Sequence, residues 1–343
     1  MSRTHKKHNL ESCTKLFALP AVLIIIMGVN ALSLPRLSAE HGIPCKSCHI
    51  NPNGGGARTE FGNYAVAFQE LCLPQTKKYV EKHYKSPRLS ESVYIGFDNR
   101  YLVLDEGGRI IRIQNDFYAT VEPFDHLLYH LRIAGGGITE HYALLYIGDD
   151  KHYLKAGQFS PAFGLRTDYH SLYLDGLSLG LDIKGVNVVA ETFNPNEQAI
   201  FGFHAFKAGF LNPFGYLIGA SARVSERELD GYGAFPHAKA VFGALNYSRF
   251  TASGELKLIG RGNEAMAAYA AFNARIEFGL YLVGEYNFYD PDRAFTTGTE
   301  EFIRLSLELY PIPFLQLRPS FTRYMEGALK DTDDFFLQIY FGY

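Results

Sequence analysis

The sequence has no tryptophan, and only four methionines and four cysteines among its 343 residues. So few cysteines exclude a scaffold held together by disulfides. After residue 31 no apolar run reaches the roughly 18 residues of a membrane-spanning helix, which argues against a bundle of such helices. Gly54-Gly55-Gly56 lacks the strand and lysine of a phosphate loop, and neither a hydrolytic triad nor a nucleic-acid-binding patch is present. We therefore expect no nucleic-acid partner and no hydrolytic chemistry.

The first 31 residues have the pattern of an export signal. Lys6, Lys7 and Lys15 are followed by an apolar run over residues 16–29, and residues 29–31 (Val-Asn-Ala) form a small-residue cleavage site. The run is shorter than the roughly 20 residues that a helix needs to cross a bilayer, so we expect cleavage. A retained N-terminal anchor is the alternative.

Residues 45–49 read Cys-Lys-Ser-Cys-His, the pattern that attaches a c-type haem through two thioethers while the histidine binds the iron. Cys45 and Cys48 are thus the predicted attachment points of one haem c, and His49 its proximal ligand. A zinc site would need a second pair of ligands, and none follows. A thioredoxin-like redox pair would need alternating strands and helices around it, which are absent. A plain disulfide between the two cysteines remains the alternative.

The sixth ligand of such an iron is harder to assign. In the mature chain methionine occurs only at positions 266 and 325, whereas histidines are more plentiful. His83 is the nearest that could fold back, and any histidine facing the inside of the following domain is the alternative. Those others are His126, His130, His141, His152, His170, His204 and His237. Two histidines would give a lower potential than a histidine and a methionine.

The remaining chain predicts an all-β protein. It is rich in glycine (33), phenylalanine (27) and tyrosine (23), with 20% charged residues, and alternating segments are separated by turn residues. This composition is typical of a transmembrane outer-membrane β-barrel. At the C-terminus one face of a strand is apolar and ends on an aromatic residue, as in the last strand of such barrels; it comprises Phe335, Leu337, Ile339, Phe341 and Tyr343. An ordinary soluble sheet is the alternative.

Alternation and turn signals predict about sixteen antiparallel strands, or fourteen if some merge. The predicted ranges are 92–104, 109–122, 126–135, 140–148, 151–159, 172–183, 186–193, 198–208, 213–224, 237–248, 250–259, 266–277, 279–289, 301–310, 313–323 and 334–343.

The connections test this count, because barrels of this class have long external loops and short periplasmic turns. The long connections at 159–171, 225–236, 290–300 and 324–333 all fall on one side of the predicted barrel, and the short ones at 149–150, 184–185, 278 and 311–312 on the other. An even number of strands returns both ends of the barrel to the periplasm, where haem is attached.

Between the signal and the barrel lies a small segment that carries the haem motif. The chain thus divides into a signal peptide (1–31), a helical or irregular mono-haem cytochrome c segment with its linker (32–90), and a porin-like barrel (91–343). An apolar stripe at helical spacing either covers a haem face or packs on the barrel wall; it comprises Phe61, Tyr64, Ala65, Phe68 and Leu71. The segment either plugs the barrel or hangs in the periplasm, and the sequence does not choose.

These residues carry a family resemblance. Residues 34–44 (Leu-Pro-Arg-Leu-Ser-Ala-Glu-His-Gly-Ile-Pro), the haem motif, Asn51-Pro52 and Glu60-Phe61-Gly62 resemble the start of the outer-membrane mono-haem cytochrome-porin fusions, known chiefly from iron-oxidising bacteria. The likeness is specific over about 35 residues and only architectural over the barrel. Leu37 stands where an aromatic residue is usual, and this chain is shorter than typical members.

The resemblance implies an electron conduit of the outer membrane. One haem, in the barrel lumen or on its periplasmic side, would pass electrons between an extracellular donor or acceptor, such as Fe(II), and a periplasmic c-type cytochrome. It implies no enzyme class beyond electron transfer. The alternative is a diffusion porin with an accessory or regulatory haem segment.

A second likeness lies in residues 154–166, which resemble a segment of several bacterial porins where a Gly-x-Phe run precedes a Phe-Gly turn. It supports a porin without naming a solute. Arg166 and Asp168 then either project into the lumen as part of a constriction or lie on the surface of a loop.

Overall fold

The computed structural model describes residues 35–84, 86, 88–105, 108–149, 151–165, 173–194, 199–225, 237–261, 264–293 and 298–342. The predictions for the export signal, for Arg166 and Asp168, and for Tyr343 lie outside these residues. Within them, no helix is long and apolar enough to cross a membrane.

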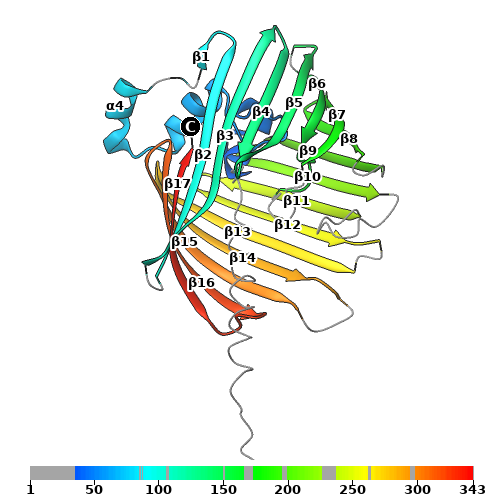
Figure 1. Ribbon diagram of the computed structural model, residues 1–343. Helices are drawn as coiled ribbons and strands as arrows, with labels where there is room; N and C mark the ends of the chain where they lie inside the picture. The colour runs from blue at the N-terminus through cyan, green and yellow to red at the C-terminus, as the bar shows by residue number, and fades with distance from the viewer. Residues whose placement is uncertain are drawn as a thin grey trace, which may run out of the picture.

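Sixteen long strands make up most of the structure (Figure 1). They are β2 (Val93–Leu104), β3 (Ile110–Phe124), β4 (Leu127–Ala134), β5 (Gly137–Ile147), β6 (His152–Phe159), β7 (Leu174–Ile183), β8 (Val186–Phe193), β9 (Ile200–Leu211), β10 (Phe214–Ser225), β11 (Ala238–Tyr247), β12 (Phe250–Ile259), β13 (Ala265–Glu277), β14 (Leu280–Asp290), β15 (Glu300–Ile312), β16 (Leu315–Glu326) and β17 (Asp333–Gly342). A short strand, β1 (Arg88–Ser90), pairs with the start of β2.

The strands close into a barrel. Each pairs antiparallel with the next, and β17 pairs with β2, where Phe336 lies opposite Leu104. The predicted fold class and the count of sixteen are therefore confirmed, and the lower count of fourteen is wrong. β8 and β12 have the predicted bounds. β5 begins at Gly137 rather than residue 140, because Gly135 and Gly136 form a tight turn with positive φ directly after β4.

The pleat separates an apolar outer face from a polar inner face. In β17, Phe335 and Phe341 are exposed on the outside, whereas Phe336 and Gln338 are buried on the inside. The same alternation runs around the barrel, so many outward side chains are large and apolar while the buried inner ones include arginines, glutamates and histidines. An apolar outer band around a polar lumen suits a barrel surrounded by lipid.

The N-terminal segment lies inside this barrel (Figure 1). It contains the helices α2 (Pro35–His41), η1 (Cys45–Ser47), η2 (Phe61–Ala67) and α3 (Phe68–Glu70); α4 (Pro74–His83) follows outside the lumen. We call residues 35–72 the plug. Helix α2 lies against β10, β11 and β12. Of the two arrangements that the sequence left open, the structure has the one in which the segment occupies the lumen.

The predicted apolar stripe of the plug is helical but does not form a single buried face. Phe61 and Tyr64 are exposed, whereas Phe68 and Leu71 are almost fully buried. Leu71 packs on Tyr281 and Tyr310 of the barrel wall. Part of the stripe therefore packs on the wall, as one of the two alternatives held.

Candidate functional site

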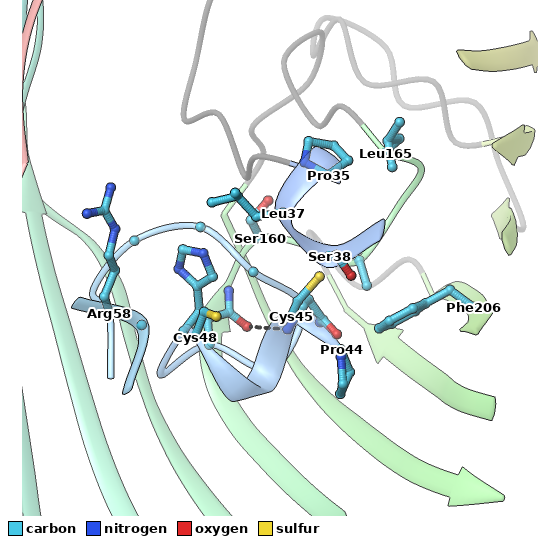
Figure 2. Close-up of a pocket in the computed structure, with 18 of the residues that line it drawn as sticks. Pro35, Leu37, Ser38, Pro44, Cys45, Cys48, Arg58, Ser160, Leu165 and Phe206 are labelled. Carbon is cyan, nitrogen blue, oxygen red and sulfur yellow. Dashed lines mark hydrogen bonds between the residues drawn. The ribbon is translucent and has the colours of Figure 1, made fainter. Parts of the chain in front are cut away.

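The two cysteines and the histidine of the haem motif line one cavity between the plug and the barrel wall. Its unfilled space amounts to about 1690 Å³, part of it open to solvent. On the plug side it is bordered by α2, η1 and residues 51–58, and on the wall side by residues of β3, β4 and β9–β11 and by the loop after β6. Figure 2 shows Cys45 and Cys48 on one stretch of the plug, with Leu37 and Ser38 of α2 beside them and Phe206 of β9 across from them.

Backbone hydrogen bonds hold the motif in a tight turn. The backbone N–H groups of Cys48 and His49 both donate to the carbonyl oxygen of Cys45, at 3.1 and 3.0 Å. This places the side chains of Cys45, Cys48 and His49 on one turn. A second segment clasps it: the Thr59 N–H donates to the Cys48 carbonyl at 2.9 Å, and the Thr59 hydroxyl to the Ser47 carbonyl at 2.9 Å.

Gly62 allows the close contact between this second segment and the haem motif, which we call the clasp. A Cβ atom at Gly62 would clash with the carbonyl oxygen of Cys48 and lie 2.9 Å from its Cα. The glycine of the Glu60-Phe61-Gly62 pattern is thus required because helix η2 crosses directly over the haem motif.

We expect Gly62→Ala to loosen the clasp by about 1–3 kcal/mol, since overpacking a tight contact costs about that much. Trypsin cleavage after Lys46 and Arg58, which tracks the opened population, should then be at least about fivefold faster. Gly284→Ala is the matched control, because a Cβ there meets nothing within 4 Å. Equal cleavage rates in both variants would contradict the assigned role.

Cys45 and Cys48 are not joined by a disulfide in the structure, and the attachment of a haem to them stays a prediction. Burial raises the pKa of the Cys45 and Cys48 thiols to about 11. Burial, together with the nearby Arg58 guanidinium, lowers the pKa of His49 to about 4. The imidazole is therefore neutral at physiological pH, the form that binds metals.

Two histidines of the barrel wall line the same cavity. His130 on β4 and His204 on β9 both line it, and both are buried. In each ring Nδ1 lies 2.8 Å from a hydroxyl oxygen, that of Thr120 for His130 and that of Ser221 for His204. Both stood among the predicted lumen histidines, but nothing in the sequence singled them out.

His83, the predicted sixth ligand, lies elsewhere. It ends α4, its side chain is exposed, its Nδ1 lies 2.8 Å from the Tyr79 carbonyl oxygen, and it does not line the cavity. The two methionines of the mature chain, Met266 and Met325, do not line it either. The structure brings His49 together with wall histidines rather than with His83, because α4 begins at Pro74 beyond the mouth of the lumen.

A positive charge also lines the cavity. The Arg58 guanidinium lines it, and its buried Nη1 makes no hydrogen bond within the described part of the chain. A second, smaller cavity adjoins His49 and Arg58 and is bordered by Asp98 and Arg100 of β2. A haem carries two carboxylate side chains, with which the guanidinium of Arg58 could pair through its unbonded Nη1. Two thiols, a neutral imidazole and this guanidinium around one cavity therefore fit the cofactor. Sequence reasoning missed Arg58, although it lies only nine residues after His49.

Residues 160–165, the described part of the loop after β6, line the cavity inside the barrel. Its backbone N–H groups donate to inward-facing side chains of the wall: Ala162 to Glu191 at 2.7 Å, Gly164 to Ser221 at 2.9 Å and Leu165 to Glu255 at 2.9 Å. These residues belong to the segment with the porin-like Phe-Gly pattern. The buried glutamates therefore pin the described part of this loop against the wall.

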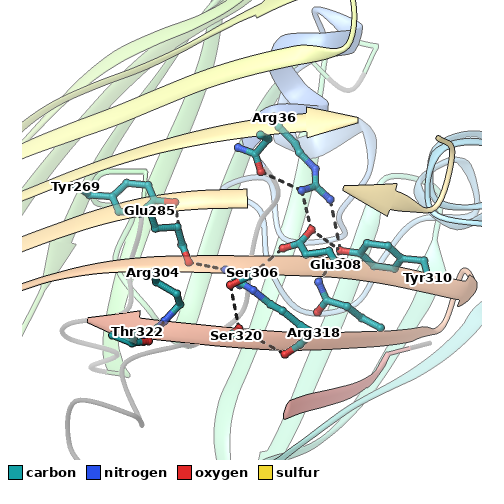
Figure 3. Close-up of polar contacts among 12 residues, drawn as sticks. Arg36, Tyr269, Glu285, Arg304, Ser306, Glu308, Tyr310, Arg318, Ser320 and Thr322 are labelled. Atoms are coloured by element: carbon teal, nitrogen blue, oxygen red, sulfur yellow. Dashed lines mark hydrogen bonds and ion pairs between the residues drawn. The ribbon is translucent and has the colours of Figure 1, made fainter. Parts of the chain in front are cut away.

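One buried ion pair and a second, partly buried group of charges fix the plug to the wall. Figure 3 shows Arg36 of α2 reaching Glu308 and Tyr310 of β15, with Nη1 2.7 Å from the Glu308 carboxylate. Arg275 of β13 pairs with two plug carboxylates, Glu70 at 2.7 Å and Glu40. These contacts join positions more than 200 residues apart in sequence.

Within the described ranges no group of three or more histidine, cysteine or acidic side chains could hold a metal ion by itself. A haem iron takes only axial ligands from the protein.

Solved structures similar to this chain include a bacterial porin and an outer-membrane protein. OprB of Pseudomonas putida, in its low-pH structure, matches with a TM-score of 0.57 and 10% identity over 78% of this chain and 95% of its own. A loop-deletion mutant of the outer-membrane protein OmpT of Vibrio cholerae matches with a TM-score of 0.52 and 11% identity over 74% and 99% of the two chains. A mutant porin of Rh. blastica gives 0.53 and 12% over 73% and 100%.

No protein-family model matches the chain, and no curated protein matches it. At such low identity the structural likeness shows the fold, which is that of a porin-like barrel. It bears out the porin half of the resemblance noted in the sequence, while membership of the cytochrome-porin fusions stays a prediction.

Proposed function

We propose that this protein is an outer-membrane electron conduit: a porin-like barrel whose plug carries one covalent haem c and passes electrons between an extracellular donor or acceptor and a periplasmic c-type cytochrome. Fe(II) is one such donor. The observation that carries the proposal is that Cys45, Cys48 and His49 line a single cavity inside the lumen, where an attached haem would lie within the barrel.

Four residues of the cavity would hold the haem. Cys45 and Cys48 would hold the haem through thioethers, His49 would bind its iron, and Arg58 would pair with a carboxylate side chain of the haem. When bound, the haem supplies one-electron transfer. The plug and residues 160–165 after β6 border the cavity and narrow its opening to solvent, and the apolar outer face of the barrel suits a surrounding of lipid.

The second candidate is a diffusion channel with an accessory haem segment. The comparisons support this candidate more directly than electron transfer, because all the similar structures described above are porins or porin-like barrels. The plug argues against a diffusion channel, since residues 35–72 occupy space inside the barrel that an open sixteen-stranded barrel would leave to water.

Lipid vesicles that contain the purified protein separate the two candidates. A redox dye and a labelled sugar are enclosed, and a membrane-impermeant reductant is added outside. We expect the dye to be reduced while the sugar stays inside. Rapid loss of the sugar would establish the diffusion channel and defeat the conduit, whether or not reductant that enters through the same pore reduces the dye.

A further inference from the structure

We infer that His204 of the barrel wall is the second axial ligand of the haem iron, so that the haem links the plug to the barrel through one histidine from each. This inference rests on the proposed function, because it requires a haem on Cys45 and Cys48. It replaces His83, which lies outside the cavity.

The ring of His204 is held in place by its neighbours. Its Nδ1 lies 2.8 Å from the Ser221 hydroxyl, and the ring stacks on Phe242 with centroids 5.4 Å apart and planes 12° from parallel. Phe206 flanks it at a centroid distance of 5.4 Å. Nε2 makes no hydrogen bond with any described residue, although the ring lines the cavity. Such an arrangement, with one ring nitrogen anchored and the other free, is typical of a metal-binding histidine.

His204 also lies on the correct side of the cavity. Cys45 packs against the apolar cluster that contains Phe206 and Phe242, the two rings that flank His204. His49 borders the smaller cavity formed with β2 and β15–β17. β9 is seven strands from β2 in a barrel of sixteen, so it stands across the lumen. An iron bound by His49 on one face would therefore present its other face towards β9.

His130 is the closest rival and serves as the matched comparison. It is equally buried in the same cavity, and its Nδ1 lies 2.8 Å from the Thr120 hydroxyl. However, its ring stacks on Tyr118, which packs with Ile50 and Ala57 of the plug next to His49. β4 is only two strands from β2. His130 therefore lies beside His49 rather than opposite it.

The test compares His204→Ala with His130→Ala in the purified full-length protein, using absorption and electron paramagnetic resonance spectra. We expect the wild type and His130→Ala to be low-spin with two imidazole ligands. His204→Ala should be high-spin, should bind carbon monoxide when reduced, and should return to low-spin when imidazole is added. A low-spin His204→Ala protein without imidazole, or a high-spin His130→Ala protein, would overturn the assignment.

Two further measurements keep failure of folding and failure of the proposed function apart. His204→Met retains a ligand, and we expect it to stay low-spin with a higher potential, because methionine raises the potential of a haem iron; an unchanged potential would count against His204. A haem stain after denaturing electrophoresis reports the covalent haem in every variant. Haem in all variants with an unaltered His204→Ala spectrum refutes this inference alone, whereas absence of haem from the wild type refutes the proposed function as well.

Discussion

Replacing both Cys45 and Cys48 with serine is expected to leave a folded, plugged barrel that carries no covalent haem and transfers no electrons. A serine hydroxyl cannot form the thioether, so attachment is lost. The ion pairs of Arg36 and Arg275 that fix the plug do not involve the cysteines, so the barrel and plug should keep their structure. Dye reduction in vesicles should fall to the rate of protein-free vesicles, while sugar leakage stays unchanged.

Cys72→Ser is the matched control for this pair. Cys72 is buried against Phe68 and Val80 and does not line the cavity. We expect it to keep both the haem stain and dye reduction. Dye reduction that persists in the Cys45→Ser/Cys48→Ser protein would show that electrons do not pass through a haem on these residues.

Removing the buried ion pairs between plug and wall is expected to open the barrel. In the double variant Arg36→Ala/Arg275→Ala, Glu308 loses its closest guanidinium, and Glu40 and Glu70 lose Arg275. Breaking one buried pair costs about 3–5 kcal/mol, because a buried charge is left behind. The plug should therefore leave the lumen for a larger part of the time, and vesicles should leak sugar at a rate well above that of the wild type.

Arg323→Ala is the control for loss of charge. Arg323 pairs with Asp333 at 3.0 Å, but both side chains are about half exposed, so the pair contributes no more than about 1 kcal/mol. It should leave leakage unchanged. If the double variant leaks no more than Arg323→Ala, the ion pairs do not hold the plug in the lumen.

The barrel could be predicted from sequence because the alternation of polar and apolar residues along a strand is a local pattern. A residue two positions along a strand returns to the same face, so the polar and apolar faces of β17 could be assigned before any contact was known. The same holds for the turn at Lys184 and Gly185, where both residues have positive φ between two strands. Sixteen strands followed from such local signals.

The site could be predicted only in part, because its other half comes from distant strands. The haem motif is a local pattern. Arg36, in contrast, binds Glu308 at a distance of 272 positions along the chain, and no periodicity of the sequence predicts that pairing. For the same reason nearness along the chain does not place His83 in the cavity. His204 lies 155 positions from His49, and closure of the barrel brings both to the same cavity.

The most direct test of the central claim, that one haem is covalently bound to the plug inside the barrel, is the mass of the purified mature chain and of its proteolytic peptide that contains residues 45–49. Our account predicts a mass increase of one haem on the chain, located on the peptide with Cys45 and Cys48. A mature chain whose mass equals that of the bare polypeptide would contradict it.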